Sequence, residues 1–350
     1  MRVAVIGSGI IVDKFIEALK MTKGASLEAV FSRTDERASA FATKHSAKKF
    51  YSDMDTMLQD PDIDTIYIAS PNSLHFEHSK KALQAGKNVI NEKPFTSTLQ
   101  ETKELFDLAK TQNRFIFEAI TTIHLPNYQI IKDNLSRCGN IKILTLNFSQ
   151  FSKRYLTYMA GQQTNIFDPK FSGGSLYDIN VYNIHFVVGL LGKPKSYKYY
   201  PNIGTTGVDT SGVLIMVYDN FVANLIAAKD SESGYMFYVQ GDKGTIRVSE
   251  SSSGVCKNVG LFLQGDSQPD GIAKFAGFSI EDAFRPIGIE QKQHMSYEVE
   301  AFAGIIKNND FAAYEKLKKQ TLDVMEILYN CRIDAGIKFS SDDLSKGGSL

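Results

Sequence analysis

The sequence predicts two domains of different fold class, an α/β domain followed by an α+β domain. In residues 1–122, short β-branched runs alternate with helical segments, which is typical of a doubly wound parallel sheet with right-handed crossovers. In residues 123–340, strand-like runs follow one another beside a few helices, which indicates an open, mainly antiparallel sheet. A length of 350 residues also favours two domains over one. Residues 341–350 are polar, and we expect them to form a tail.

The composition excludes several kinds of partner. The chain has 39 basic and 39 acidic residues, so no net charge favours binding to nucleic acid or to an anionic membrane. No apolar run approaches the roughly 18 residues that cross a bilayer. The three cysteines are scattered, which predicts a reducing, cytoplasmic location, and no cluster of ligands has the spacing of a metal site.

The chain begins with a short strand, a glycine turn and a helix, the context that a dinucleotide-binding fingerprint requires. Gly7 allows the tight turn, and Gly9 lets the backbone approach a pyrophosphate at the start of the helix. Ile10 and Ile11 follow in the same turn, and we expect them to contact the cofactor. The third position of the fingerprint is Val12 rather than Gly or Ala.

The end of the second strand predicts which nucleotide is bound. An NAD site places Asp or Glu here to hold the ribose 2′-hydroxyl, but this chain has Ser32, Arg33 and Thr34. The Arg33 guanidinium can stack on adenine and pair with a 2′-phosphate, to which the two hydroxyls can donate. The sequence therefore predicts NADP as the preferred cofactor. In the alternative, Arg33 is solvated and NAD is accepted as well.

The other elements of the first domain continue the alternation. We expect strands at residues 27–31, 65–69, 89–90 and 115–117, and helices at 13–20, 35–48, 53–58, 75–85 and 99–111. Because carboxyl ends of parallel strands meet at one edge, the loops after two of these strands should surround a nicotinamide. The cofactor residues predicted there are Ser70, Pro71, Asn72, His75, Glu92 and Lys93.

Lys93 is held at this rim by a restricted backbone, because the following Pro94 disfavours the helical region for it. Taken alone, this stretch is also compatible with a solvated lysine in a surface turn.

The second domain is predicted from hairpins and long helices. Asp219-Asn220 and Gly241–Gly244 are turn signals between pairs of strands. We expect strands at 142–151, 211–218, 221–228, 235–240 and 245–249, loops at 250–258 and 264–272, and helices at 128–135, 179–191, 295–306 and 314–335. If the outer face of the sheet is apolar, self-association is the simplest way to cover it. In the alternative, its aromatic residues fill the domain's own core.

One helix of the second domain carries a polar stripe. Asp178, Tyr182 and His185 stand at i, i+4 and i+7, so they share a helical face. In isolation, such a stripe is also typical of a partly wet helix face with internal hydrogen bonds.

Four segments together resemble the Gfo/Idh/MocA family of nucleotide-dependent oxidoreductases over nearly the whole chain. They are Val5–Ile11, Ser70–His75, Ala85–Phe95 and Gly173–Tyr182. The resemblance implies an amino-terminal Rossmann domain and an open-sheet second domain that forms homodimers or homotetramers through its sheet. It also implies NAD(P)-linked hydride transfer on sugars, polyols or dihydrodiol-like alcohols and carbonyls.

The resemblance also assigns residues. Lys93 matches the catalytic lysine of the Glu-Lys-Pro motif, and Asp178 and Tyr182 match the second motif. The last position of that motif is His in inositol-dehydrogenase-like members, and its Tyr version is similar to the glucose–fructose oxidoreductase and dihydrodiol dehydrogenase branches. Asn180 replaces the glycine of the family's Asp-Ile-Gly.

The chemistry gives each residue a role. Reduction of a carbonyl needs a hydride from nicotinamide C4, a cation near the developing alkoxide and a proton donor. We expect Lys93 to be the cation and Tyr182 the acid, with its phenol pKa lowered by the ammonium, although the two roles can be exchanged. Asp178 would orient Lys93 or a substrate hydroxyl. His185 and Arg154 are predicted substrate contacts, with a structural role as the alternative for His185.

Two competing functions stay open at this stage. A cofactor-binding regulator without turnover uses the same fold, but intact Lys93, Asp178 and Tyr182 favour an enzyme. An S-adenosylmethionine site is compatible with the glycine loop but not with the Glu-Lys-Pro rim or the second sheet.

Overall fold

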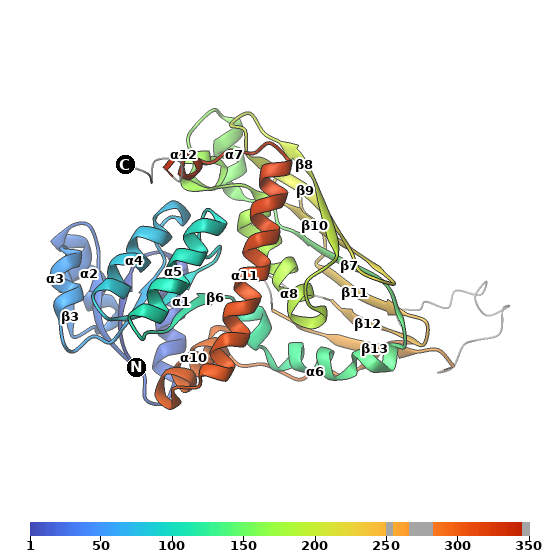
Figure 1. Ribbon diagram of the computed structural model, residues 1–350, viewed down its shortest axis with the longest axis horizontal. Coiled ribbons are helices and arrows are strands. Elements are labelled where there is room, and N and C mark those ends of the chain that lie inside the picture. The colour runs from blue at the N-terminus through green and yellow to red at the C-terminus, as the bar shows by residue number, and fades with distance from the viewer. Residues whose placement is uncertain (250–254, 266–282, 345–350) are drawn as a thin grey trace.

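The computed structural model describes residues 1–249, 255–265 and 283–344, which form two sheets (Figure 1). Sheet A and its helices lie at the left of Figure 1 and sheet B lies at the right, with the long helix α11 (Phe311–Asp334) between them. The predicted combination of a doubly wound parallel sheet and an open, mainly antiparallel sheet is confirmed.

Sheet A has six parallel strands in the order β3-β2-β1-β4-β5-β6. The strands are β1 (Arg2–Ile6), β2 (Ser26–Phe31), β3 (Lys49–Tyr51), β4 (Thr65–Ile68), β5 (Asn88–Glu92) and β6 (Ile116–Ala119). Its helices are α1 (Ile10–Met21), α2 (Asp35–His45), α3 (Met54–Gln59), α4 (His75–Gln84) and α5 (Leu99–Thr111). The strand order reverses between β1 and β4, and in such sheets ligands bind outside the carboxyl ends at this point.

Among the described residues, sheet B has eight strands in the order β14-β13-β12-β11-β7-β10-β9-β8, and only the pair β7–β10 is parallel. The strands are β7 (Ile141–Ser149), β8 (Ser196–Ile203), β9 (Asp209–Val217), β10 (Val222–Ala228), β11 (Met236–Gly241), β12 (Gly244–Val248), β13 (Val259–Leu263) and β14 (Arg285–Pro286). The edge strand β8 was not predicted, because its outward residues Ser196, Lys198 and Tyr200 are polar and exposed. Parts of the predicted loops at 250–258 and 264–272 lie outside the described residues.

The remaining helices connect the two sheets. They are α6 (Pro126–Asn134), α7 (Lys153–Met159), α8 (Val181–Leu191), α10 (Met295–Asn308), α11 and α12 (Ser341–Leu344). Short 3₁₀ turns lie at Asn72–Leu74, Thr121–His124, Leu135–Cys138, Asn165–Phe167 and Pro169–Phe171. Helix α10 packs on α1, where Gln293 Nε2 donates to the Lys14 carbonyl at 2.9 Å, and Phe302 stacks on Phe117 of β6. None of the helices in the described ranges is long and apolar enough to cross a membrane.

Sequence chemistry explains why these elements begin where they do. Thr98 and Glu101 form a reciprocal capping box at the start of α5, and Asp310 caps α11. Apart from their first residues, Arg2 and Thr65, strands β1 and β4 consist of buried, mainly apolar residues, because helices cover both faces of sheet A. Across this core, the rings of Phe15 on α1 and Tyr67 on β4 stack with centroids 3.6 Å apart.

The predicted tail needs a correction. Asp342 forms a bidentate ion pair with the buried Arg332 of α11, with nitrogen–oxygen distances of 2.6 and 2.7 Å. It also accepts a hydrogen bond from the Phe339 amide at 2.8 Å. Residues 341–344 are therefore part of the fold, because they satisfy a buried guanidinium. Residues 345–350 lie outside the described residues.

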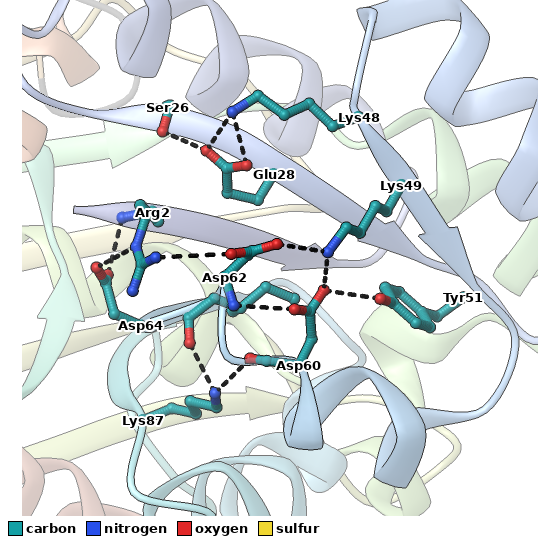
Figure 2. Close-up of polar contacts among 11 residues, drawn as sticks. Arg2, Ser26, Glu28, Lys48, Lys49, Tyr51, Asp60, Asp62, Asp64 and Lys87 are labelled. Atoms are coloured by element: carbon teal, nitrogen blue, oxygen red, sulfur yellow. Dashed lines mark hydrogen bonds and ion pairs between the residues drawn. The ribbon is translucent and has the colours of Figure 1, made fainter.

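The amino ends of the strands of sheet A are joined by a network of ion pairs (Figure 2). Lys49 Nζ lies 2.8 Å from both Asp60 and Asp62, and Tyr51 donates to Asp60 at 2.8 Å. Burial opposes the ionisation of Asp60, but the bond from Lys49 holds its pKa down to about 2. Lys87 Nζ donates to the carbonyls of Asp60 and Ile63 at 2.8 and 2.6 Å. This network ties β3 to the loop before β4 and to the start of β5.

Candidate active site

The turn between β1 and α1 is shaped for close backbone contact. Gly7 has φ +118°, and a Cβ there would lie 2.7 Å from the Ala69 carbonyl oxygen, so this position requires glycine. Nothing lies within 4 Å of a Cβ built on Gly9, and the side chain of Ile10 is 76% exposed. The first amides of α1 and this open, apolar rim fit a pyrophosphate and its nucleoside. Val12, the departure from the fingerprint, is fully buried against the sheet.

The end of β2 presents the residues predicted to select the nucleotide. Thr34 caps α2 by accepting from the Arg37 amide at 3.4 Å, and the Ser32 amide donates to the Tyr51 carbonyl at 3.1 Å. Arg33 is exposed beside them, and its guanidinium has no ion pair within the described ranges. This geometry leaves the cation free to meet a phosphate.

The loop after β4 bridges the two domains. Asn72 Nδ2 donates to the Ser172 carbonyl at 3.2 Å. His75 corrects a prediction, because its ring is 1% exposed and its nitrogens each lie 2.9 Å from a backbone carbonyl, of Pro94 and Ser70. Burial lowers the pKa of His75 to about 4, so the ring is neutral. His75 therefore joins the two loops and does not present a free ring to a cofactor.

The loop after β5 is held from several sides. Asn91 Nδ2 donates to the Phe95 carbonyl at 2.5 Å, and the Phe95 amide donates to Glu118 at 3.0 Å. Glu92 was predicted to bind the cofactor, but it accepts from Tyr67 at 2.6 Å inside the sheet, and burial raises its pKa. Hydrogen bonds from Asn91 and to Glu118 thus fix the backbone at Phe95, close to Lys93.

Lys93 meets the polar stripe of the second domain. Its Nζ donates to the Asp178 carbonyl at 2.7 Å and to Asp178 Oδ1 at 3.1 Å, and it lies 5.0 Å from the centroid of the Tyr182 ring. The structure thus brings Lys93 of the first domain together with Asp178 and Tyr182 of the second, although Lys93 and Asp178 lie 85 residues apart in the sequence. Burial lowers the pKa of Lys93, but Asp178 and Tyr182 raise it by more, so the lysine stays protonated.

The ammonium lowers the phenol pKa as expected, but the net shift has the opposite sign. Burial raises the pKa of Tyr182 to about 12, although the Lys93 ammonium pulls it downward. Its ring contacts Lys93 and Phe148 and packs on the apolar core, and no hydrogen bond to its hydroxyl is present among the described residues. The phenol therefore keeps its proton at neutral pH.

Sequence reasoning missed a second lysine. Lys229 directly follows β10, its side chain is 7% exposed, and its Nζ pairs with Asp178 Oδ2. Asp178 therefore lies between two ammonium groups, which hold its pKa well below the usual range although burial opposes this. The sequence held no clear signal for Lys229, because a lysine at a strand end is usually solvated.

The helix that carries Asp178 begins in an unusual way. Residues Leu176–Asn180 form a π-helical turn before α8. A Cβ on Gly173 would lie 2.6 Å from the Ile166 carbonyl oxygen, and one on Gly174 would lie 2.3 Å from Asp209 Oδ1, which explains the two glycines. Asp209 accepts from the Leu176 amide at 2.6 Å and anchors the turn.

Asn180 replaces the family's glycine without entering the site. It is fully buried, and its Oδ1 accepts from Asn183 Nδ2 at 2.9 Å. Asn183 also donates to the Ile226 carbonyl at 3.0 Å. The substitution therefore ties α8 to β10 and leaves Asp178 at the surface of the site.

The predicted substrate contact by His185 is wrong. The side chains of His185 and Glu118 have no exposed surface, and Nε2 lies 3.0 Å from Glu118 Oε2. Gln320 of α11 donates to the His185 carbonyl at 3.1 Å on the other side. A substrate cannot reach this ring, which instead joins α8 to β6. The sequence could not reveal this pairing, because the two partners lie in different domains.

A cavity of about 290 Å³ borders the meeting point of the domains. Its lining includes Asp178, the loop after β4 and Arg154 of α7, so Arg154 does lie at the pocket. The lining residues are Ala69, Ser70, Pro71, Asn72, Arg154, Asn165, Ile166, Phe171 and Asp178. No group of His, Cys, Asp and Glu side chains in the described ranges could hold a metal ion.

Family models match both halves of the chain. Residues 1–119 match the "Oxidoreductase family, NAD-binding Rossmann fold", and residues 134–247 match the "GFO/IDH/MocA C-terminal domain". The chain is 34% identical over 343 residues to scyllo-inositol 2-dehydrogenase (NADP(+)) IolU of Bacillus subtilis, covering 98% of this chain and 99% of the relative. It is 26% identical over 307 residues to trans-1,2-dihydrobenzene-1,2-diol dehydrogenase of Xenopus tropicalis, covering 85% and 86%.

Solved structures share the fold at lower identity. The 3-ketoreductase KijD10 of Actinomadura kijaniata, in complex with NADP and TDP-benzene, superposes with a TM-score of 0.81 at 20% identity, covering 95% of this chain and 97% of that one. The two matching domains and the full-length relative agree with the motifs at the glycine turn, the Glu-Lys-Pro loop and the Asp-Ile-Asn helix. The chain therefore belongs to the Gfo/Idh/MocA family of NAD(P)-dependent oxidoreductases.

Proposed function

We propose that this protein uses NADP(H) to interconvert an alcohol and a carbonyl on a sugar, polyol or dihydrodiol-like substrate. The observation that carries the proposal is the meeting of Lys93 from the first domain with Asp178 and Tyr182 from the second, beside a cavity that Asp178 lines. Bound nicotinamide would supply or accept the hydride. The open rim at Gly9 and Ile10 is where the nucleotide would lie.

The protein's own residues divide the remaining work. Asp178 holds the Lys93 ammonium in place. Because the pKa of Lys93 is raised, this side chain is favoured as a fixed cation beside the reacting oxygen. The Tyr182 hydroxyl keeps its proton until an alkoxide needs it, which favours Tyr182 as the donor in reduction. In the oxidation direction, the same phenol would receive the proton. Arg154 would contact the substrate from the opposite wall of the cavity.

Two observations support NADP over NAD. The exposed Arg33 stands at the end of β2 without an acidic neighbour at position 32 or 34. The names of the relatives IolU and the xylose dehydrogenase of Hypocrea jecorina both specify NADP(+). The substrate class is supported in the same way, because relatives named for inositol, dihydrodiol and xylose substrates all oxidise hydroxyl groups.

The activity can be tested by nicotinamide absorbance at 340 nm. Purified protein would be mixed with NADP⁺ or NAD⁺ and a panel of scyllo-inositol, other inositols, D-xylose, other aldoses and trans-dihydrodiols. We expect turnover with at least one panel member and a higher kcat/KM with NADP⁺. Tight cofactor binding without turnover on any member would instead support a regulatory protein.

We also propose that two copies associate through the outer face of sheet B. That face carries exposed apolar side chains beside polar ones, with exposed fractions of 39–60% for Val217, Val222, Met236, Ile143 and Tyr200. Exposed apolar side chains on a sheet favour association. A second copy of the chain can cover them, because in a two-fold dimer the same surface of each copy packs on the other. Light scattering should give at least a dimer, and Val217→Glu with Val222→Glu, which are cross-strand neighbours, should give a monomer. Met21→Glu, an exposed apolar position on α1, is the matched control.

A cytoplasmic location is part of the same proposal. Cys138, Cys256 and Cys331 are all buried and unpaired, as expected of a protein in a reducing compartment.

A further inference from the structure

We propose that Lys229 is a positioning residue that neutralises Asp178, so that the charge of Lys93 remains available to the reacting oxygen. This inference rests on the proposed oxidoreductase function and adds a residue to its site. None of the motifs that identify the family contains Lys229, which lies on sheet B and reaches the site from the side opposite Lys93.

The backbone of Lys229 is fixed on both sides. Its amide donates to the Thr210 carbonyl at 2.9 Å and continues the β9–β10 ladder, and its carbonyl accepts from the Ser152 amide at 3.0 Å. Ser152 is the N-cap of α7, the helix that carries Arg154 at the cavity. Lys229 therefore links the sheet, the helix at the cavity wall and the site carboxylate.

The side chain of Lys229 has little freedom to act elsewhere. It is 7% exposed, and the one contact of its Nζ in the described ranges is with Asp178 Oδ2. Burying an ammonium is costly unless an opposite charge compensates it. The position of Lys229 is therefore a specific arrangement around Asp178 and not a solvated surface lysine.

The directly contacting charges do not cancel. Two ammonium groups, of Lys93 and Lys229, share the single carboxylate of Asp178. Glu92 also acts on Lys93, but it accepts from the Tyr67 hydroxyl and burial raises its pKa, which opposes its ionisation. The surplus positive charge lies at the place where an alkoxide would gain negative charge, and such preorganised charge stabilises a transition state.

Lys93 also keeps a donor free. An ammonium has three N–H donors, and Lys93 uses two of them, for the Asp178 carbonyl and for Oδ1. If Lys229 were absent, both carboxylate oxygens of Asp178 would be available to Lys93. The whole negative charge of Asp178 would then offset the charge of Lys93. Lys229 thus keeps Asp178 from neutralising Lys93.

The kinetic test compares Lys229→Met, Lys229→Arg and the wild-type enzyme. We expect kcat to fall about 10–100-fold in Lys229→Met, with the Kd of NADPH, measured by fluorescence, within about twofold. Lys229→Arg should recover most of kcat because it restores the cation. The matched control is Lys87→Met, which removes another buried lysine, bonded to two carbonyls at the opposite end of sheet A. It should lower stability but leave kcat unchanged.

A second measurement does not depend on turnover. In the protein without cofactor, the ¹³C NMR titration of the Asp178 carboxyl reports the charges that face it, which are Lys93, Lys229 and the Tyr182 phenol. Its midpoint should rise in Lys229→Met and return in Lys229→Arg. An unchanged midpoint, or a kcat loss that Lys87→Met reproduces, would overturn the inference. If wild-type protein turned over no substrate, the proposed function would fail, while the titration would still decide whether Lys229 controls the charge of Asp178.

Discussion

At the amino ends of the strands of sheet A, cations and carboxylates are matched, whereas at the carboxyl ends two cations share one carboxylate. In Figure 2, Arg2, Lys48 and Lys49 pair with carboxylates, and Lys87 donates to backbone carbonyls. The carboxylates are Glu28, Asp60, Asp62 and Asp64. At the carboxyl end, two lysines share Asp178, and Arg33 has no ion pair among the described residues.

This difference indicates that the charges at the amino end of sheet A contribute to stability, while those at the carboxyl end contribute to function. Paired charges gain their full interaction in the folded protein and offer nothing to a ligand. An unbalanced cluster costs stability, and that cost is recovered only when an anionic group or a developing charge arrives. The amino end should therefore matter for unfolding and the carboxyl end for turnover, which substitutions can test.

The largest expected effect is at the carboxyl end. Lys93→Ala and Tyr182→Phe should each lower kcat about 10²–10⁴-fold, because one removes the cation and the other the proton donor. The Kd of NADPH should change little. The matched control, Lys49→Ala, removes a lysine from the amino-end network and should leave kcat unchanged. Near-normal turnover in both site variants would contradict the assignment.

The next effect concerns the nucleotide. Arg33→Asp should shift the ratio of kcat/KM for NADP to that for NAD about 10–100-fold towards NAD, since a charge-assisted bond to the 2′-phosphate becomes a repulsion. The control is Lys20→Asp, which makes the same change of charge in the last turn of α1, away from the glycine turn at the start of that helix. A ratio that moves equally in both variants would mean that Arg33 acts only through the overall charge.

A buried carboxyl near the site gives a pH-dependent effect. Glu298 of α10 is 1% exposed, neither of its oxygens has a hydrogen bond within the described ranges, and burial, followed by Glu92, raises its pKa. Because the unfolded carboxyl ionises near pH 4.5 while the folded one stays protonated, the free energy of unfolding should fall as pH rises above 4.5.

Glu298→Met should remove this decline and raise the free energy of unfolding by about 1–3 kcal/mol at pH 8, with little difference at pH 4. Urea unfolding at both pH values measures it. Glu298→Gln keeps buried polar atoms but cannot ionise. It therefore separates the cost of burying polar atoms from the cost of burying a charge. The prediction would be contradicted if the free energy of unfolding depended on pH equally in the wild-type protein and in Glu298→Met.

The smallest effect is at the amino end. Asp60→Asn should lower the free energy of unfolding at pH 7 by about 1–2 kcal/mol, because the ionised carboxyl loses its bonds to Lys49 and Tyr51. Its lowered pKa means that the contribution is complete above pH 3.8 and is lost as pH falls towards about 2. Asp55→Asn, which removes an exposed partner of Lys81, is the control and should have little effect. A change in kcat without a change in stability would reverse the contrast between the two ends.

The sequence predicted where the carboxyl-end loops lie, because their positions follow from local chemistry, but it did not predict that His75 and Glu92 are buried there. Glycine turns and the Glu-Lys-Pro loop after apolar strands fix where Gly7 and Lys93 must lie. The edge rule for parallel sheets then brings Ser70–Asn72 close to Lys93. The i, i+4 spacing of Asp178 and Tyr182 placed them on one face, and both contact Lys93 across the domains.

What the sequence could not predict depends on contacts between distant segments. Lys229 and His185 have partners in other elements, Asp178 and Glu118, and no periodicity reveals such pairs. The pKa of Tyr182 was predicted with the wrong sign because the ammonium could be inferred from the motif, but the extent of burial could not. The ion pair of Arg332 with Asp342 was hidden in a segment that looks polar throughout.

A crystal structure with NADP⁺ and a bound polyol tests the central claim most directly. The account predicts that nicotinamide C4 faces the gap between Lys93 Nζ and the Tyr182 hydroxyl, with the reacting substrate oxygen within about 3.2 Å of both groups. A nicotinamide ring bound away from these two side chains, or a substrate oxygen contacting neither, would contradict it.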